Sequence, residues 1–247
     1  MGMHESPTPP REIPREHLGG RPVGRYGFLG VLGAGAAAVV WGGPISHFVS
    51  RVVNPVADST GLSTVIPTSG WRIYTVADTM PKFDPATWRL RVGGMVDRPT
   101  TLSYAELKQF PRVEQTSTFH CVTGWVIKNV HWAGVRLSDV LEHVQPHAAA
   151  TALRFTSSEQ PYEDSLTRQQ ASLHDVLLAY EMDGLPLKRE HGAPVRLVIP
   201  EMYGYKNVKW VSGITLEAKA TDGYWEQRGY DRDAWVGHSN AVFGIAP

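Results

Sequence analysis

The residue with the clearest chemical potential in this sequence is Cys121, the only cysteine among the 247 residues. Because it has no second cysteine to pair with, its thiol cannot form a disulfide within the chain. A lone thiol has three ordinary roles: an inert part of the core, a catalytic nucleophile or a soft metal ligand. β-prone residues precede it and Gly124 and Trp125 follow. We therefore expect a strand that ends in a tight turn and presents the thiol at the rim of a sheet.

Two later segments combine positive charge with potential hydrogen-bond donors. His191 and Arg196 flank the start of one predicted strand, and Lys206 and Lys209 belong to a second segment that also contains Gly204. Gly204 is expected to let the backbone approach a ligand closely. Together the two segments would suit a phosphate or another anion that accepts many hydrogen bonds. Taken alone, each segment is better explained by ordinary charges at the ends of strands.

The elements that must position these residues are short. Ser103 and Glu106 form a capping box that opens one short helix. A second short helix is predicted at 138–144, after a turn that contains Trp132 and Gly134. Alternating, apolar or β-prone runs predict strands at 71–76, 88–92, 115–119, 152–156, 176–182, 195–199 and 208–211. Because strands and helices do not alternate regularly, the pattern indicates an α+β fold.

Charge and hydropathy divide the chain into four predicted parts. These are a disordered tail at 1–25, a transmembrane anchor or signal-like helix at 26–48, a linker at 49–70 and a folded domain at 71–247. The segment 26–48 contains no Asp, Glu, Lys or Arg, and the arginines before it predict an extracytoplasmic domain. Arg25 and Tyr26 resemble a twin-arginine export signal in which Tyr26 replaces the second arginine. The 24 basic and 24 acidic residues balance, so no nucleic-acid partner is expected.

From Trp71 to the C-terminal region, the chain resembles the molybdopterin-binding domain of the sulfite oxidase family, especially its small bacterial, membrane-associated members. The resemblance rests on the Cys121 segment and on residues 132–137, 154–156, 191–196, 203–210 and 223–230. It implies mixed β-sheets with short helices, and no immunoglobulin-like domain at the C-terminus. It also implies a molybdenum–molybdopterin cofactor whose metal is bound by Cys121. The residues that the resemblance assigns to the cofactor are Cys121, Thr156, His191, Arg196, Lys206, Asn207, Val208 and Lys209. His120 neighbours the ligand but is expected to point to the opposite face of the strand.

The resemblance also implies the reaction, a two-electron oxygen-atom transfer. Members that oxidise sulfite carry an Ala-Gly-Asn-Arg-Arg run after the cysteine, whereas residues 122–128 of this chain contain no arginine and include Trp125. That difference favours reduction of an S- or N-oxide, with sulfite oxidation as the alternative. The expected partners are a small-molecule oxygen donor or acceptor and a membrane cytochrome or quinone, and the chain is expected to be a monomer.

Two hypotheses from other classes remain open. In the first, a histidine such as His120, His131 or His191 activates Cys121 as a nucleophile. In the second, the domain is a membrane-tethered binding module that holds no cofactor. Metal content separates these hypotheses, because only the oxidoreductase is expected to contain molybdenum.

Overall fold

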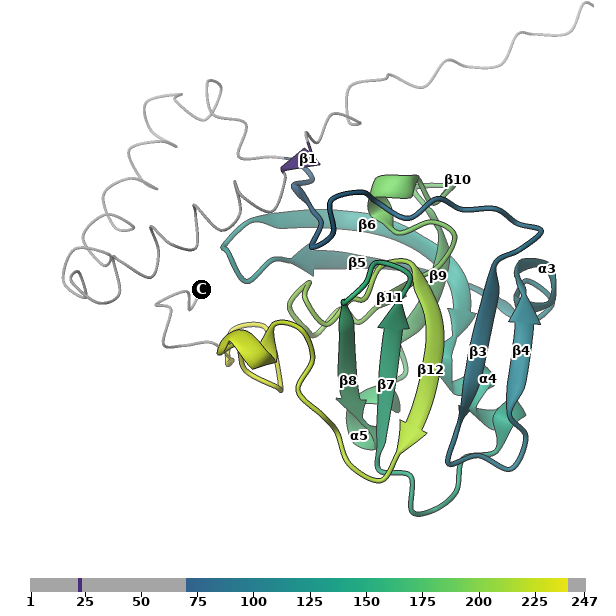
Figure 1. The fold of residues 1–247 in the computed structure, drawn as a ribbon. Coiled ribbons are helices and arrows are strands. Elements are labelled where there is room, and N and C mark those ends of the chain that lie inside the picture. Colours follow the sequence, from purple (N-terminus) through teal and green to yellow (C-terminus); the bar gives the residue numbers. More distant parts are fainter. Residues whose placement is uncertain (1–21, 24–69, 240–247) are drawn as a thin grey trace, which may run out of the picture.

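The structure, a computed structural model, describes residues 22–23 and 70–239. Two five-stranded sheets make up most of this part of the chain (Figure 1). The predicted anchor at 26–48 lies outside the described residues, as do nearly all of the predicted tail and linker. Among the residues that are described, no helix is long and apolar enough to cross a membrane.

The first sheet has the strand order β10–β9–β6–β5, and β11 also pairs with β9. All of its pairs are antiparallel. Its strands are β5 (Arg112–His120), β6 (Val126–Arg136), β9 (Leu177–Met182), β10 (Leu185–Pro186) and β11 (Arg196–Val198). In Figure 1 the β5–β6 hairpin reaches beyond the second sheet, and its far end carries Cys121.

The second sheet has the order β4–β3–β12–β7–β8, in which only β12 and β3 are parallel. Its strands are β3 (Arg89–Gly94), β4 (Thr100–Ser103), β7 (Ala152–Ser157), β8 (Glu163–Thr167) and β12 (Val211–Glu217). A separate short parallel pair joins β1 (Pro22–Val23) to β2 (Ile73–Tyr74). The helical elements are α3 (Tyr104–Leu107), α4 (Leu137–Val144), α5 (Arg168–Ala171), η2 (Arg189–His191) and η3 (Glu226–Arg228). This mixture confirms the predicted α+β class.

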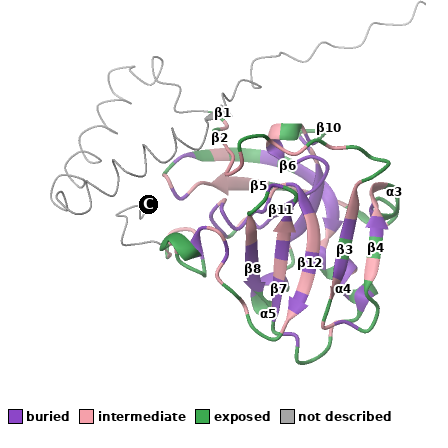
Figure 2. Cartoon of the chain, viewed as in Figure 1, coloured by how far each residue is buried: buried purple, intermediate pink, exposed green. Residues whose placement is uncertain are grey.

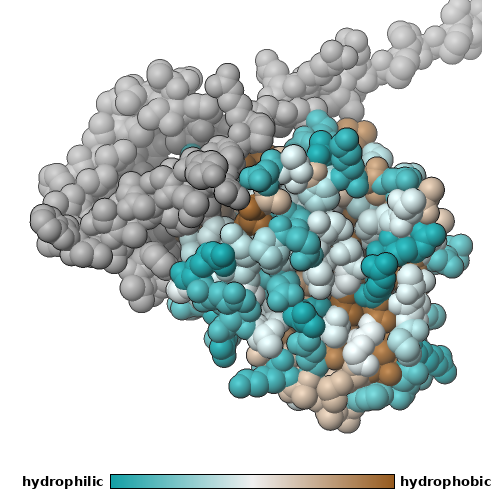
Figure 3. All heavy atoms as spheres, viewed as in Figure 1, coloured by the Kyte–Doolittle hydropathy of each residue, from teal (hydrophilic) through white to brown (hydrophobic). Residues whose placement is uncertain are grey.

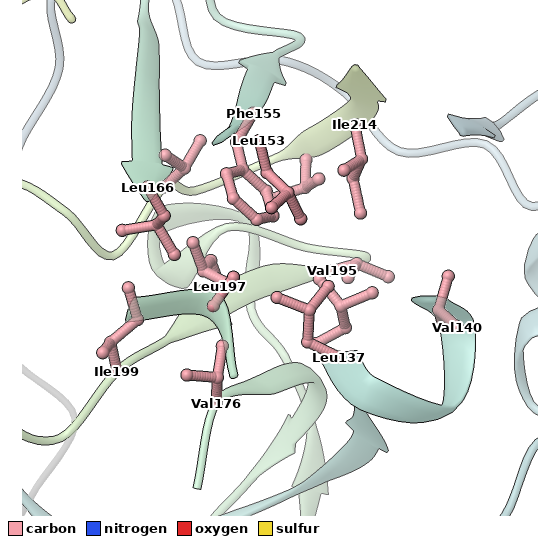
Figure 4. Packing of buried hydrophobic residues seen from close by; sticks show 14 of the residues in the cluster. Leu137, Val140, Leu153, Phe155, Leu166, Val176, Val195, Leu197, Ile199 and Ile214 are labelled. Carbon is pink, nitrogen blue, oxygen red and sulfur yellow. The ribbon is translucent and has the colours of Figure 1, made fainter. Parts of the chain in front are cut away.

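The main core lies between the two sheets. In Figure 4, Leu153 and Phe155 of β7 and Ile214 of β12 face Leu197 of β11 and Leu137 of α4. All five side chains are fully buried. Buried and partly exposed positions alternate along β12 from Ile214 to Glu217 (Figure 2), as expected for a strand with one face on a core. On the face drawn in Figure 3, hydrophobic residues show only in small areas among hydrophilic ones.

The capping box is confirmed. The Ser103 side chain accepts a hydrogen bond from the Glu106 backbone N–H, and the Glu106 carboxylate accepts one from the Ser103 backbone N–H. The predicted turn at Trp132 and Gly134 is wrong, because both residues lie inside β6. Gly134 is needed for strand packing rather than for a turn: an added Cβ would lie 2.2 Å from the backbone oxygen of Leu178 in β9.

One further sequence-based prediction needs correction near the basic segment. The strand predicted at 208–211 instead begins at Val211, because Trp210 has a left-handed backbone with φ of 51°. Gly204 lies against the hairpin, since an added Cβ there would lie 2.4 Å from the ring of Phe119. The glycine therefore allows the β5–β6 hairpin to pack closely against residues 203–210.

Candidate cofactor site

The thiol lies where the sequence predicts it, in a tight turn after a strand. β5 ends at His120, and the Cys121 backbone N–H donates to the Trp125 carbonyl at 2.9 Å. The Gly124 N–H donates to the Cys121 carbonyl at 3.0 Å, and Gly124 takes the left-handed φ of 91° that glycine adopts easily. This turn closes the β5–β6 hairpin and holds the sulfur at its end.

A cavity brings the thiol together with four of the predicted cofactor residues. Its lining includes Cys121 from the hairpin and His191, Arg196, Asn207 and Lys209 from the two later segments. The yellow C-terminal segment in Figure 1, on the same side of the domain as the hairpin end, adds Trp225 and Tyr230. Segments that are distant in sequence therefore form one site around the single cysteine.

Three of the predicted cofactor residues do not line this cavity. Lys206 is 2% exposed, and its ammonium lies 2.6 Å from Asp164 Oδ1 and 2.5 Å from Glu226 Oε1. Val208 is buried in the main core. Thr156 borders a separate surface groove together with Ser212. His120 is also absent from the cavity lining, consistent with its expected position on the other face of the strand.

Three buried nitrogen atoms on the cavity wall have no hydrogen-bond partner in the described part of the chain. They are the indole nitrogen of Trp125, Nδ1 of His191 and Nε of Arg196. Buried polar atoms are nearly always paired, so each such atom needs an explanation. A polar ligand in the cavity would supply the missing partners. The polar atoms present therefore fit a group rich in oxygen and nitrogen, such as a pterin that ends in a phosphate.

The cations in the cavity wall lie close to backbone carbonyls. Arg196, 3% exposed, donates from Nη1 to the His191 carbonyl at 3.1 Å. Lys209 Nζ donates to the Tyr74 carbonyl at 2.7 Å. Burial lowers the pKa of Arg196 to about 10 and that of Lys209 to about 7. Both groups would gain from a bound anion, because it would replace the solvation that burial removes.

His191 completes this basic wall as a neutral donor or acceptor. Burial, followed by the charges of Arg196, Lys209 and Lys188, lowers its pKa to about 3. The imidazole is therefore uncharged at neutral pH and can donate or accept one hydrogen bond at its free Nδ1. The Asn207 side chain accepts from the Ile199 N–H at 2.6 Å, which fixes the loop that leads to Lys209.

The surroundings of Cys121 shift the pKa of its thiol in both directions. Burial raises the pKa of the Cys121 thiol, although the Thr123 side chain and the charge of Arg72 act in the opposite direction. Cys121 Sγ lies 3.2 Å from Thr123 Oγ1. The described residues contain no cluster of three or more His, Cys, Asp or Glu suited to a metal. A metal bound to Cys121 would therefore need its other ligands from a cofactor.

Sequence reasoning missed several cavity residues. Trp71 packs against His191 at 5.0 Å and Phe119 at 4.9 Å between ring centroids. Glu159 accepts hydrogen bonds from the backbone N–H groups of Val76 and Ala77, and so holds the segment after Trp71 over the cavity. The strand pattern at 71–76 marked this segment as ordered, but no local signal placed it at the cofactor site. Tyr230, by contrast, belongs to a segment that carried the family resemblance.

The family model described as the oxidoreductase molybdopterin binding domain matches residues 77–225. The chain therefore belongs to the molybdopterin-binding oxidoreductases of the sulfite oxidase family. Cys121 and the four predicted residues that share its cavity all lie within the matched range. The described residues 70–239 contain no immunoglobulin-like domain.

Relatives of this chain share the family but differ in length. It is 36% identical to the oxidoreductase YuiH of Bacillus subtilis, over 68% of this chain and 85% of YuiH. It is 33% identical to rat mitochondrial sulfite oxidase, over 61% of this chain and 33% of that protein. It is also 31% identical to the protein-methionine-sulfoxide reductase catalytic subunit MsrP of Campylobacter jejuni, over 58% of this chain and 54% of MsrP. Among solved structures, the sulfane dehydrogenase SoxCD of Paracoccus pantotrophus matches the fold, with a TM-score of 0.57 and 24% identity over 62% of this chain and 43% of that one.

Proposed function

We propose that this protein binds molybdenum–molybdopterin through Cys121 and reduces an S- or N-oxide by oxygen-atom transfer. The observation that carries the proposal is the set of unpartnered buried nitrogen atoms, on Trp125, His191 and Arg196, that line one cavity with the lone cysteine. When bound, the cofactor supplies the two-electron oxygen-transfer chemistry. The protein supplies the cavity and the groups that hold the cofactor.

The residues around the cavity have separate roles in this proposal. Cys121 would donate its thiolate to the metal, and the bound cation would keep the sulfur deprotonated despite the burial that raises its pKa. Arg196 and Lys209 would hold the phosphate end of the cofactor through charge-assisted hydrogen bonds. His191, neutral at physiological pH, would hydrogen-bond a polar group of the pterin rather than pair with its charge.

The wall near the thiol supports an oxide rather than sulfite as substrate. Trp125 and Phe119 stack with ring centroids 5.5 Å apart and line the cavity. Residues 122–128 provide none of the arginines expected after the cysteine in sulfite-oxidising members. The relative MsrP, named as a protein-methionine-sulfoxide reductase, is in line with this choice. Sulfite oxidation is the alternative, since rat sulfite oxidase is also a relative.

A cysteine-nucleophile enzyme receives less support. His131 Nδ1 lies 2.9 Å from Thr116 Oγ1, and both residues border a groove whose lining does not include Cys121. The low pKa of His191 disfavours an imidazolium that could stabilise a thiolate. Burial also raises the pKa of Cys121, the opposite of what an activated nucleophile needs.

The cellular setting is part of the proposal. The uncharged segment 26–48 would anchor the domain on the extracytoplasmic side of a membrane, and electrons would come from a membrane cytochrome or quinone. The substrate would be a small molecule and the protein a monomer. Fractionation of cells that express the full chain tests the anchor, because a protein without one would be recovered in the soluble fraction.

The function is tested with purified protein from a host that makes the cofactor. We expect about one molybdenum per chain and viologen-dependent reduction of S- or N-oxides that exceeds sulfite oxidation. Cys121→Ser should reduce turnover at least about 1000-fold, because it removes the protein ligand of the metal. Cys121→Ser should leave the unfolding midpoint nearly unchanged. Metal-free protein with full activity that thiol alkylation abolishes would support the nucleophile hypothesis instead.

A further inference from the structure

The cations that line the cavity come from different parts of the chain. Arg196, which is buried, and Lys209, which is half-buried, belong to the two basic segments proposed to hold the cofactor. Arg72 lines the same cavity from the position after Trp71, whose ring packs against Phe119 and Trp125 on either side of Cys121. Arg72 is therefore a separate cation near the hairpin that carries the cysteine.

Arg72 differs from the other cavity cations in exposure and in partners. It is solvent-exposed, whereas Arg196 is buried and donates to backbone carbonyls. Within residues 70–239, no hydrogen bond or ion pair engages the guanidinium of Arg72. Arg112 and Arg154, in contrast, are each paired with two carboxylates. Arg72 therefore has its donors available at the mouth of the cavity.

The backbone on both sides of Arg72 is fixed. Trp71 lies in the aromatic cluster with Phe119 and Trp125, and Ile73 is buried. The Tyr74 carbonyl accepts a hydrogen bond from Lys209. Arg72 is thus an extendable side chain on a firmly held segment. This arrangement allows the guanidinium to reach a molecule in the cavity at little cost in backbone order.

The chemistry around the cysteine defines a class of ligand. The rings of Phe119 and Trp125 provide an apolar wall. A guanidinium binds a carboxylate with two parallel hydrogen bonds, which a neutral group cannot accept as well. A small organic molecule with an apolar body and one carboxylate matches both features. An inorganic oxyanion would use the guanidinium but leave the aromatic wall without a partner.

We propose that Arg72 determines substrate specificity by binding a carboxylate of the substrate, so that the preferred substrates are small organic S- or N-oxides that carry such a group. This inference rests on the proposed reductase function. It places the positive charge of Arg72 beside the substrate. Arg72 lies outside residues 77–225, the range that the family model matches. Residues 122–128 contain no arginine. Arg72 would then supply, from another segment, the positive charge that those arginines provide in sulfite-oxidising members.

The test uses molybdenum-loaded protein and two substrates with the same oxide. N-acetylmethionine sulfoxide carries one carboxylate, and its N-methylamide carries none. We expect the wild type to prefer the carboxylate and Arg72→Gln to raise KM for it about tenfold to a hundredfold, with kcat little changed. The neutral amide should be reduced equally by both proteins, and Arg72→Lys should restore part of the preference.

Arg98→Gln is the matched control, because Arg98 is an exposed arginine outside the cavity. It should leave both substrates unaffected. Equal loss on both substrates in Arg72→Gln, or no preference in the wild type, would overturn the role of Arg72. Protein that reduces neither substrate would instead contradict the proposed reductase function.

A binding measurement distinguishes failure of the Arg72 proposal from failure of the proposed reductase function. Acetate added to the molybdenum-loaded protein should quench the fluorescence of the neighbouring tryptophans in the wild type. The apparent dissociation constant should rise at least tenfold in Arg72→Gln and stay unchanged in Arg98→Gln. Equal dissociation constants for acetate in the wild type and Arg72→Gln would reject the anion-binding role of Arg72, whether or not the oxides are reduced.

Discussion

Two lysines three positions apart in the sequence, Lys206 and Lys209, occupy opposite kinds of environment. The Lys206 ammonium lies between the carboxylates of Asp164 and Glu226, and their charges outweigh the effect of burial and raise its pKa. Lys209 donates to the Tyr74 carbonyl, and burial lowers its pKa to about 7. Lys206 already has two counter-ions, the carboxylates of Asp164 and Glu226. Lys209 faces a cavity in which an anion can bind.

The difference separates a structural cluster from a binding site. Lys206, Asp164 and Glu226 come from three segments whose neighbours Tyr205, Tyr162 and Trp225 line the cavity. The ionic cluster therefore ties the cavity walls together from behind. Arg196 and Lys209 instead contribute positive charge to the cavity itself. A cation buried between carboxylates of its own chain is already neutralised, whereas a cation that donates only to neutral carbonyls has a charge that an anionic ligand can still neutralise.

The largest effect is expected for Lys206→Met. Removing the ammonium leaves two buried carboxylates without their cation, which should lower the free energy of unfolding by about 3–5 kcal/mol. Urea denaturation measures this loss, and Lys219→Met, at an exposed lysine, should stay within about 0.5 kcal/mol of the wild type. The triple variant Lys206→Met, Asp164→Asn, Glu226→Gln should recover part of the stability. A fully stable Lys206→Met would show that the cluster does not hold the fold.

The next largest effect is expected for Lys209→Met, on the cofactor rather than on the fold. Loss of one charge-assisted hydrogen bond to a phosphate should weaken cofactor retention about tenfold to a hundredfold. The unfolding free energy of the cofactor-free protein should fall less than in Lys206→Met, because Lys209 donates to backbone carbonyls and forms no salt bridge within residues 70–239. Molybdenum and pterin content after extended dialysis provides the measurement. Normal cofactor retention together with a destabilised fold would show that Lys209 stabilises the fold and does not hold the cofactor.

The smallest of the three effects is a pH dependence of anion binding to the cofactor-free protein. Lys209 has a pKa of about 7 in the folded protein and an ordinary value of 10.5. Between these values the unfolded chain binds more protons, so this residue contributes stability that is present at high pH and lost as the pH falls towards 7. A bound anion favours the protonated form. Anion binding above pH 7 should therefore take up a proton.

Sulfate is a suitable probe because its charge does not change between pH 6 and pH 8. Its dissociation constant, measured by calorimetry, should rise about tenfold over this range in the wild type. Lys209→Met should bind sulfate weakly at both pH values. Lys219→Met should behave as the wild type does. A pH dependence that survives in Lys209→Met would assign the proton to another group.

The sequence predicts the parts of the site that depend on local pattern. Cys121 after a β-prone run, and His191, Arg196, Asn207 and Lys209 in two basic segments, all line one cavity as expected from the family resemblance. Their cofactor-binding roles stay predictions. The α+β class and the capping box were also accessible, because strand periodicity and helix capping are properties of neighbouring residues.

The sequence cannot predict features that depend on what faces a residue in space. Lys206 looks like Lys209 in sequence, and only the fold brings Asp164 and Glu226 to it. Gly134 resembles a turn residue, but the close approach of β9 is what requires a glycine there. Arg72 belongs to a strand-like run that carries no cofactor signal, and the packing of its neighbours places it at the cavity.

The most direct test of the account is X-ray absorption at the molybdenum edge for the wild type and Cys121→Ser, both purified with metal. Molybdenum in Cys121→Ser should have one fewer sulfur neighbour than in the wild type, because the proposed ligands are the Cys121 thiolate and the two sulfurs of the pterin. An identical sulfur count in the two proteins would contradict it.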